Sequence, residues 1–544
     1  MKVINFTLYI SLFLYSVSLA QSDKSSTEEP MTAKKWRADI QYLIEQLPKR
    51  HPNLYHKISK DKLYREFAAL DARLESLAQY EIPIALAKIV AQIGDMHTSV
   101  RQEPKFYSPL EYYVFGDDLY IIGADSQYVE LAGVRVTQIG NTPVNDALDS
   151  LLTVYPVENL YGGKSNVAAL AIRTELFSAM RIIDDPRKVP LTYETPAGVK
   201  SIIVVSTTER PNIDLFVRAN RNSQNDTPFW MDSRNSNYWF EYIAETSTLY
   251  AQFNFVRNNE EGESVADFFE RLYQWAKTND FDRFVLDLRK NGGGGDQLFQ
   301  SSIKRLVSEP LNRPGKFFTI IGRDVASAAQ HLVNDLEYLT NTIFVGEPTG
   351  QNVQFYSDSR YFLLPESGLG VRTCLGWMQN SVPSPFEKRD ALYPIIAAEP
   401  TIESYSDNID PSLEAIYAYE YQEPLTKRME TAIRAGELTS LADMHWKFVN
   451  DPANKYINTK NALNTLGYSL DWNDATDAVK ILFKLNIQAH PNSANCHDSY
   501  GELLLSIGDT TQAIVEYKQA LILDSEGRIG ANAKKILAEL VDFK

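Results

Sequence analysis

A serine and four consecutive glycines are the residues of this chain whose types and spacing best suit chemistry. The glycines occupy residues 292–295, shortly after an apolar run at 284–286, and Ser327 follows among alanines. A serine hydroxyl can act as a nucleophile, and glycine amides at a strand end can stabilise the oxyanion that forms during acyl transfer. The same residues also fit a helix N-cap and a tight turn, which carry no chemistry.

The surrounding sequence predicts how these residues are positioned. Strand patterns alternate with helical patterns at residues 249–255, 265–276, 284–286, 303–307, 317–321, 328–336 and 343–345. Such alternation predicts right-handed crossovers and a largely parallel sheet, with a ligand crevice at the carboxyl ends of the strands. The glycines and Ser327 both follow strands, so we expect them to face one crevice.

Three motifs, in this order, resemble the signatures of the C-terminal processing (tail-specific) serine peptidases. They are DLRKNGGG at residues 287–294, SAAQ at 327–330 and VGEPTG at 345–350. The family includes the catalytic core of the tricorn protease, and the resemblance extends from about residue 36 to about residue 419.

This resemblance implies an α/β fold with a crotonase-like core and Ser327 as the nucleophile. It also implies an oxyanion hole formed by the amide of Gly293 or Gly294 together with that of Ala328. The predicted site includes no cofactor and no metal.

The general base is predicted to be a histidine. Family members of the Ser-Lys type carry a lysine where this chain has Asn352, and asparagine cannot act as a base. Tricorn-like members take a histidine from the N-terminal helical segment, and IGDMHT at residues 93–98 resembles that motif, which makes His97 the predicted base. We expect its pKa to lie near the usual value of about 6.5. Met96 occupies the place of tricorn's relay serine, so the group that orients His97 stays open.

Two glutamates are candidates for an acid that orients His97. Glu403 and Glu414 lie in the late region from which tricorn takes a glutamate, although each also fits a solvated surface charge. His331, four residues after Ser327, shares its predicted helix face. From that position a side chain usually packs or caps rather than reaching the serine.

Composition narrows the class of protein. The chain has 544 residues, of which 44% are hydrophobic and 23% charged, which suits about three globular domains. A net charge of −16 argues against nucleic acid or an anionic membrane surface as a main partner. The two cysteines, Cys374 and Cys496, fall in different predicted domains and are expected to be free.

Five segments are expected along the chain. Residues 1–20 resemble a secretory signal peptide, because Lys2 precedes a short apolar stretch and Ser18-Leu19-Ala20 offers a small-x-small cleavage site. We therefore expect a periplasmic or secreted bacterial protein without a membrane span after cleavage. The remaining segments are a helical N-terminal segment at 21–105, a PDZ-like β domain at 106–207, the α/β core at 236–420 and a tetratricopeptide-like helical domain at 425–544.

Particular patterns support these assignments. Short strands are expected between residues 107 and 205, and residues 131–144 resemble the carboxyl half of a PDZ domain. In the tail, Gly467 and Gly501 are 34 residues apart, which is the tetratricopeptide period.

His51 and His56 have no acidic or cysteine companion nearby in the sequence, so their spacing does not predict a metal site.

The function predicted from these observations is an exported serine peptidase that acts on peptides or proteins. A non-catalytic protein that binds a peptide or small ligand on the same fold is the alternative. A third reading is a tetratricopeptide scaffold with a vestigial core. In each case the helical tail is a candidate surface for a protein partner.

Overall fold

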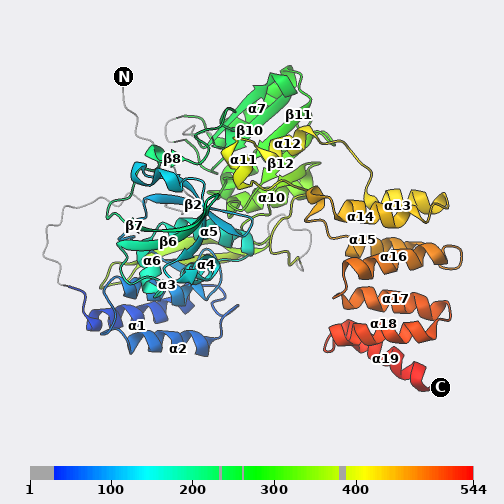
Figure 1. The fold of residues 1–544 in the computed structure, drawn as a ribbon, viewed down its shortest axis with the longest axis horizontal. Coiled ribbons are helices and arrows are strands. Elements are labelled where there is room, and N and C mark those ends of the chain that lie inside the picture. Colours follow the sequence, from blue (N-terminus) through cyan, green and yellow to red (C-terminus); the bar gives the residue numbers. More distant parts are fainter. Residues whose placement is uncertain (1–29, 232–235, 260–261, 379–386, 543–544) are drawn as a thin grey trace. The chain divides into compact units, whose positions relative to one another are not determined.

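A computed structural model of the chain describes residues 30–231, 236–259, 262–378 and 387–542 (Figure 1). The predicted signal peptide at residues 1–20 lies outside the described residues. The chain forms two compact units, one with residues up to 394 together with 398–418, and the other with 395–397 and 419–544. No described helix combines the length and the apolar character needed to cross a bilayer.

The helical segment at the start of the first unit is confirmed. It contains α1 (Ala33–Arg50), α2 (Lys60–Asp71) and α3 (Glu81–Ala91). Thr32 and Ser59 cap the first two helices, since each side chain accepts the amide three residues on. The apolar faces of the three helices pack into one core, and the chain then turns into the two-residue strand β1 (Ser99–Val100).

Strand β1 joins a three-stranded sheet made mostly from residues far along the chain. It pairs antiparallel with β15 (Gly370–Met378), which forms a hairpin with β14 (Phe355–Leu363). The predicted hairpin after residue 356, with its turn at 365–368, is thereby confirmed. The pairing of Ser99 with Arg372 fixes the residues that immediately precede β1.

The next segment is an antiparallel sheet with helices, where the sequence pattern predicts only strands. The sheet follows the order β2-β3-β4-β6-β7, with β5 beside β4 and β8 beside β3. Its strands are β2 (Leu110–Phe115), β3 (Asp118–Ala124), β4 (Arg135–Ile139), β5 (Thr142–Pro143), β6 (Lys188–Thr195), β7 (Gly198–Val205) and β8 (Val217–Arg218).

Three helices interrupt these strands: α4 (Val144–Leu152), α5 (Leu160–Ala171) and α6 (Thr174–Ala179). Val144, Ala147, Leu148 and Leu151 are buried at helical spacing along α4. Because this period is 3.6 rather than 2, the strand prediction fails for that stretch.

The predicted strand and helix alternation in the core is confirmed. The sheet has the order β16-β13-β12-β11-β10-β9, and the pairs among β10, β11, β12 and β13 are parallel. Its strands are β9 (Tyr238–Ile243), β10 (Thr248–Phe253), β11 (Arg283–Asp287), β12 (Phe317–Ile321), β13 (Ile343–Gly346) and β16 (Ile396–Ala397).

Helices of the same region complete this core (Figure 1). They are α7 (Val265–Thr278), α8 (Asp296–Gln300), α9 (Ile303–Leu306) and α10 (Ala328–Leu339). Two short helices follow later in the chain, α11 (Ile402–Ser406) and α12 (Pro411–Tyr417). The protein is therefore a mixed α/β fold with several sheets and a helical region at its C-terminal end.

The second unit is helical. Its helices are α13 (Leu425–Arg434), α14 (Ser440–Val449), α15 (Lys460–Ser469), α16 (Thr476–Ala489), α17 (Ala494–Ser506), α18 (Thr510–Leu523) and α19 (Arg528–Asp542). Gly467 on α15 lies against Phe483 on α16, and Gly501 on α17 lies against Tyr517 on α18. The glycines that match in sequence thus make equivalent close contacts between consecutive helices.

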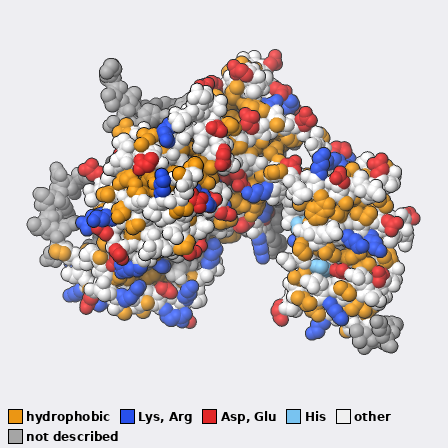
Figure 2. Space-filling view, viewed as in Figure 1, with side chains coloured by type: hydrophobic (Ala, Val, Ile, Leu, Met, Phe, Trp, Pro, Cys, Tyr) orange, Lys and Arg blue, Asp and Glu red, His pale blue; other side chains and the backbone are white. Residues whose placement is uncertain are grey.

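Charge is distributed over both units. Figure 2 shows acidic and basic side chains on each of them. Both cysteines, Cys374 and Cys496, are buried and free, as predicted.

We predict that Gly467→Ala destabilises the helical unit. A Cβ at this position would lie 2.4 Å from a ring carbon of the buried Phe483. The free energy of unfolding should fall by about 1–3 kcal/mol through overpacking, although glycine to alanine inside a helix ordinarily adds about 1 kcal/mol. Urea unfolding followed by circular dichroism measures the change.

Gly501→Ala is the matched comparison, because its nearest contact to Tyr517 would be 3.2 Å and the expected loss is smaller. Combining Gly467→Ala with Phe483→Leu should cost less than the sum of the two single changes, since a smaller side chain makes room. Strictly additive losses would contradict the contact.

Candidate active site

The candidate site lies where three parallel strands of the core end. Strands β11, β12 and β13 end at Asp287, Ile321 and Gly346. The glycines follow the first strand, Ser327 follows the second, and the Gly-Glu-Pro-Thr motif begins at the end of the third. As the parallel topology predicts, these loops emerge from one edge of the sheet.

Asn291 fixes the glycine loop. Its side-chain amide donates to the Phe253 carbonyl at 2.8 Å, and its Oδ1 accepts the Gly293 amide at 2.9 Å. Its own carbonyl accepts the Ala326 amide at 3.3 Å, which joins the loop to the residue before Ser327. Gly293 has a φ of 99°, and a Cβ there would lie 2.7 Å from the Ser327 Cβ, so only glycine permits this approach.

Ser327 has a backbone conformation that L-residues rarely adopt, with φ 55° and ψ −128°. It directly precedes α10, yet its side chain makes no capping hydrogen bond to the helix, so the simple N-cap reading fails. Its amide donates to the Oε1 atom of Gln351. A strained serine between a strand and a helix is a known means of exposing a nucleophilic hydroxyl.

His97 and Ser327, which are 230 residues apart in sequence, are in contact. The His97 Nε2 atom lies 3.2 Å from the Ser327 Oγ, within reach for proton transfer. His97 lies just before β1, and both residues are buried. The structure therefore brings together the two residues that the sequence predicts as base and nucleophile.

Asp95 holds the backbone of His97 and pairs with His51. One carboxylate oxygen accepts the His97 amide at 3.0 Å, and the other lies 2.9 Å from His51 Nε2. The Asn53 amide donates to His51 Nδ1, so in this arrangement the ring proton of neutral His51 is on Nε2 and points at Asp95.

His51 was expected to have no acidic residue or cysteine nearby, and the structure shows that this expectation is wrong. His51, Asp95 and Cys374 place donor atoms within 4.8 Å of one another, all from buried residues. A metal on the His51 Nε2 would have to displace the proton given to Asp95, while Nδ1 already accepts an amide. These contacts favour a hydrogen-bonded pair over a metal site.

The pKa of His97 differs from the expected value near 6.5. Burial is the main cause that holds this pKa well below its usual range, and the electrostatic effects of Arg372 and of His331 act in the same direction. The backbone carbonyl of Tyr356 acts in the opposite direction. His97 is therefore neutral, and able to accept a proton, well below pH 6.5.

The three predicted oxyanion donors differ in their hydrogen bonds. The Gly293 amide is already bonded to Asn291, whereas the amides of Gly294 and Ala328 have no protein acceptor among the described residues. Ala328 follows Ser327 in the chain, and Gly293 lies against Ser327 in space. Gly294 and Ala328 are thus the amides available to a ligand without a change of partner.

Neither predicted acid meets the base. The Glu403 and Glu414 side chains are exposed on α11 and α12, and no hydrogen bond joins either of them to His97 within the described part of the chain. The His97 Nδ1 atom has no hydrogen-bond partner among the described residues. His331 packs as expected, because its Nδ1 lies 2.7 Å from the Asp296 carboxylate.

Two polar residues near His97 and Ser327 were not predicted from the sequence. Gln351 accepts the Ser327 amide and donates at 3.1 Å to Glu158, which also accepts the Met96 amide at 3.1 Å. Glu158 lies in a loop ahead of α5 and belongs to no motif. Only the three-dimensional contacts reveal it.

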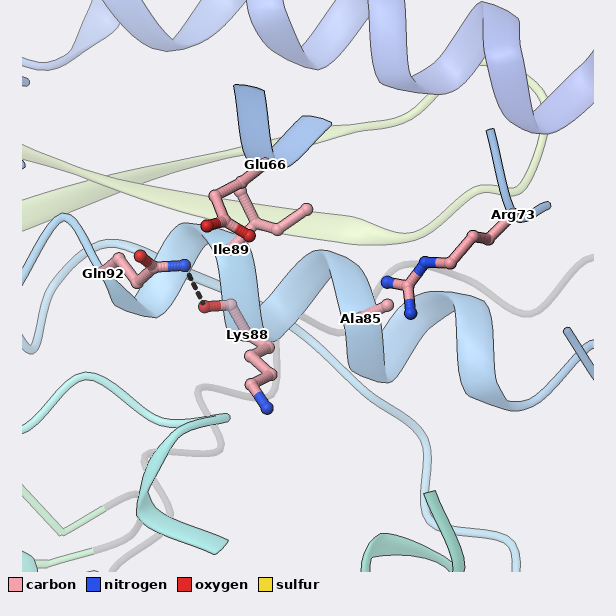
Figure 3. Close-up of a pocket in the computed structure, with 6 residues that line it drawn as sticks. All are labelled: Glu66, Arg73, Ala85, Lys88, Ile89 and Gln92. Carbon is pink, nitrogen blue, oxygen red and sulfur yellow. Dashed lines mark hydrogen bonds between the residues drawn. The ribbon is translucent and has the colours of Figure 1, made fainter. Parts of the chain in front are cut away.

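A pocket elsewhere is unrelated to this site. It has a volume of about 210 Å³ and is lined by side chains of α2, α3 and their adjoining turns (Figure 3). Its polar groups, which include Glu66, Arg73 and Lys88, are of mixed charge. None of its lining residues belongs to the Ser327 site.

Comparison with solved structures identifies the fold. Mature CPAF in complex with lactacystin matches with a TM-score of 0.52 at 12% identity, covering 71% of this chain and 97% of CPAF. The chain has the fold expected of the tail-specific serine peptidases. Other similar structures are the photosystem II D1 C-terminal processing protease (TM-score 0.35, 12% identity, 72% and 100% covered) and the tricorn protease (0.33, 13%, 71% and 36%).

No protein-family model and no curated protein matches the sequence. The tail-specific peptidase fold is therefore identified by the three-dimensional comparison, in agreement with the resemblance of the three short motifs.

We predict that Arg372→Gln raises the pKa of His97 toward its usual value. Removing the positive charge makes the protonated ring less unfavourable, while the burial that dominates the shift remains. Titration of the histidine resonances by NMR measures the change. Arg360→Gln on the neighbouring strand is the control, because that side chain is exposed. An unchanged His97 titration in Arg372→Gln would contradict the assigned electrostatics.

Proposed function

We propose that the protein is an exported serine peptidase in which Ser327 is the nucleophile and His97 the general base. The observation that carries this proposal is the 3.2 Å contact between the His97 Nε2 and the Ser327 Oγ. The strained backbone of Ser327 supports it, because such strain is retained where the surrounding structure enforces it and is frequent at active sites.

The reaction proceeds through acylation and hydrolysis. The Ser327 Oγ attacks the carbonyl carbon of the scissile peptide bond while His97 Nε2 takes the hydroxyl proton. The C–N bond then breaks, and His97 returns the proton to the leaving amine. A water molecule gives its proton to His97, attacks the acyl-enzyme and releases the carboxylic product with regeneration of Ser327.

Backbone amides stabilise the negative charge that forms on the carbonyl oxygen. Gly294 and Ala328 are the proposed donors, since their amides are free of protein acceptors among the described residues. Gly293 can contribute only by exchanging its bond with Asn291. The acid that would orient His97 is not assigned, because Glu403 and Glu414 are exposed.

The finer architecture belongs to the same proposal. The core is crotonase-like, the sheet of β2 to β8 with its helices is PDZ-like, and the helical unit is tetratricopeptide-like. The repeated contacts of Gly467 with Phe483 and of Gly501 with Tyr517 support the last assignment. Export rests on the signal-like residues 1–20, and the helical unit is the proposed surface for a protein partner.

We predict that a fluorophosphonate probe labels the protein at Ser327. Labelling should disappear in Ser327→Ala and fall by about 1,000-fold or more in His97→Ala, because the base is needed to activate the hydroxyl. Mass spectrometry locates the label, and hydrolysis of a mixed peptide library measures activity.

The double variant should lose little more activity than either single variant, because the two residues act as one unit. A non-catalytic binding protein predicts no label and no peptide cleavage even though the fold is intact. Retention of most activity in His97→Ala would show that another group is the base.

We predict that Gly293→Ala lowers kcat by about 100-fold or more through displaced oxyanion donors. The new Cβ would lie 2.7 Å from the Ser327 Cβ and 2.8 Å from the Ala328 amide nitrogen. Gly315→Ala is the matched control, because Gly315 also has a positive φ, 70°, but no atom within 4 Å of an added Cβ. Equal activity in the two variants, each with a native circular dichroism spectrum, would contradict the role of this loop.

A further inference from the structure

We propose that Glu158 is a positioning residue for the catalytic pair, an inference that rests on the function proposed above. Its carboxylate links the turn that carries His97 to the side chain that holds the Ser327 amide. It does so without touching either catalytic side chain.

The contacts form a chain from base to nucleophile. The Oε1 atom of Glu158 accepts two hydrogen bonds, from the Met96 amide at 3.1 Å and from Gln351 Nε2 at 3.1 Å. Met96 is the residue before His97, and Gln351 accepts the Ser327 amide through its Oε1. One carboxylate oxygen therefore restrains both sides of the 3.2 Å contact.

The link to Ser327 bears on its strained backbone. A residue at φ 55° and ψ −128° needs surrounding contacts to keep it there. The Gln351 oxygen holds the Ser327 amide, and Glu158 orients the Gln351 side chain by accepting one hydrogen bond from its Nε2. Because an amide side chain can flip, this bond selects the orientation in which the oxygen faces Ser327.

Glu158 itself is held in place by its neighbour. Asn159 donates to the carbonyl of Thr349 at 3.0 Å, and its side chain caps α5 by accepting the Gly162 amide. A Cβ on Gly162 would lie 2.2 Å from the Gly350 carbonyl oxygen, so α5 begins directly against the loop that carries Gln351. The contacts of Asn159 and Gly162 with Thr349 and Gly350 thus hold Glu158 beside Gln351.

The second carboxylate oxygen of Glu158 differs from the first in its hydrogen bonding. Oε2 is buried and has no hydrogen-bond partner among the described residues. Burial raises the pKa of Glu158 to about 7, and this exceeds the opposing effects of its two hydrogen bonds. The ionisable groups that face it are Asp95, Lys57, Tyr155 and Cys374.

Ionisation of Glu158 should therefore change the strength of its hydrogen bonds to Met96 and Gln351. Above pH 7 the carboxylate is charged, and charge-assisted hydrogen bonds to Met96 and Gln351 are about twice as strong as neutral ones. Below pH 7 the group is protonated and both bonds weaken. The transition of His97 lies well below pH 6.5, so the two titrations are separable.

The test compares the rate of fluorophosphonate labelling from pH 5 to pH 9 in the full-length protein and in Glu158→Gln. The wild-type rate should fall about 5- to 10-fold as the pH drops through 7 and fall again where His97 is protonated. Glutamine keeps the size and an oxygen acceptor but cannot ionise. Glu158→Gln should lack the upper transition, keep the lower one and label about 5- to 10-fold more slowly above pH 8, with unchanged affinity for the probe.

Glu130→Gln is the control, because that carboxylate is exposed, and it should keep the wild-type profile. A transition near pH 7 that persists in Glu158→Gln overturns the inference. Absence of labelling in the wild-type protein at every pH overturns the proposed peptidase function, and the inference with it.

A second variant tests the path through Gln351. Gln351→Leu removes the acceptor of the Ser327 amide and should slow labelling about 10-fold or more. Combined with Glu158→Gln, it should cost less than the product of the two single effects, because both changes act on one chain of contacts. Fully multiplicative losses would contradict this path and leave Glu158 with no route to Ser327.

Discussion

The candidate site depends on a contact between two residues that lie 230 positions apart, His97 Nε2 and Ser327 Oγ. Each comes from a different element: His97 from the turn before β1 and Ser327 from the start of α10. The contact therefore requires the helical N-terminal segment to be docked on the α/β core. The pairing of β1 with β15 provides one point of attachment, and within the N-terminal segment the Asp95 carboxylate holds the His97 amide.

Burial of His97 and Ser327 keeps the imidazole ring in its neutral form. A serine and a histidine in water would meet rarely, and the histidine would be partly protonated near its usual pKa. Here both are buried and the ring is kept neutral. No carboxylate is bonded to the Nδ1 atom among the described residues, and the Tyr356 backbone carbonyl is the neighbour that favours the protonated ring. A strongly lowered pKa keeps the His97 ring neutral and therefore able to accept a proton. The same shift makes the protonated form of the ring less stable.

Local patterns were sufficient to predict much of the core. Ser327 and the glycines follow apolar strands whose period is visible in the sequence, and the order of strands and helices predicts that they share one edge. His97 required the motif as well, since a lone histidine has no distinguishing period. Helix α4 was not predicted because its helically spaced apolar residues lie in a region where strand patterns precede and follow it.

The long-range polar contacts could not be predicted from the sequence. Asp95 meets His51, Glu158 meets Gln351, and Asn159 meets Thr349, and in each pair the residues are ordinary in type and distant along the chain. No periodicity encodes such contacts, because hydrogen bonds between side chains depend on how separate elements dock. The expected pKa of His97 was wrong for the same reason. The shift is caused mainly by burial, and the elements that bury the ring are distant from it in the sequence.

The pairing of β1 with β15 has a consequence for the order in which the protein acquires its site during synthesis. The ribosome makes His97 early and Ser327 much later, but the strand that anchors the histidine turn ends only at Met378. A chain that has emerged as far as α10 already contains His97 and Ser327, yet lacks the partner strand of β1. Because the contact between the hydroxyl and the imidazole uses a turn held by β15, we expect it to form only after most of the first unit has been made.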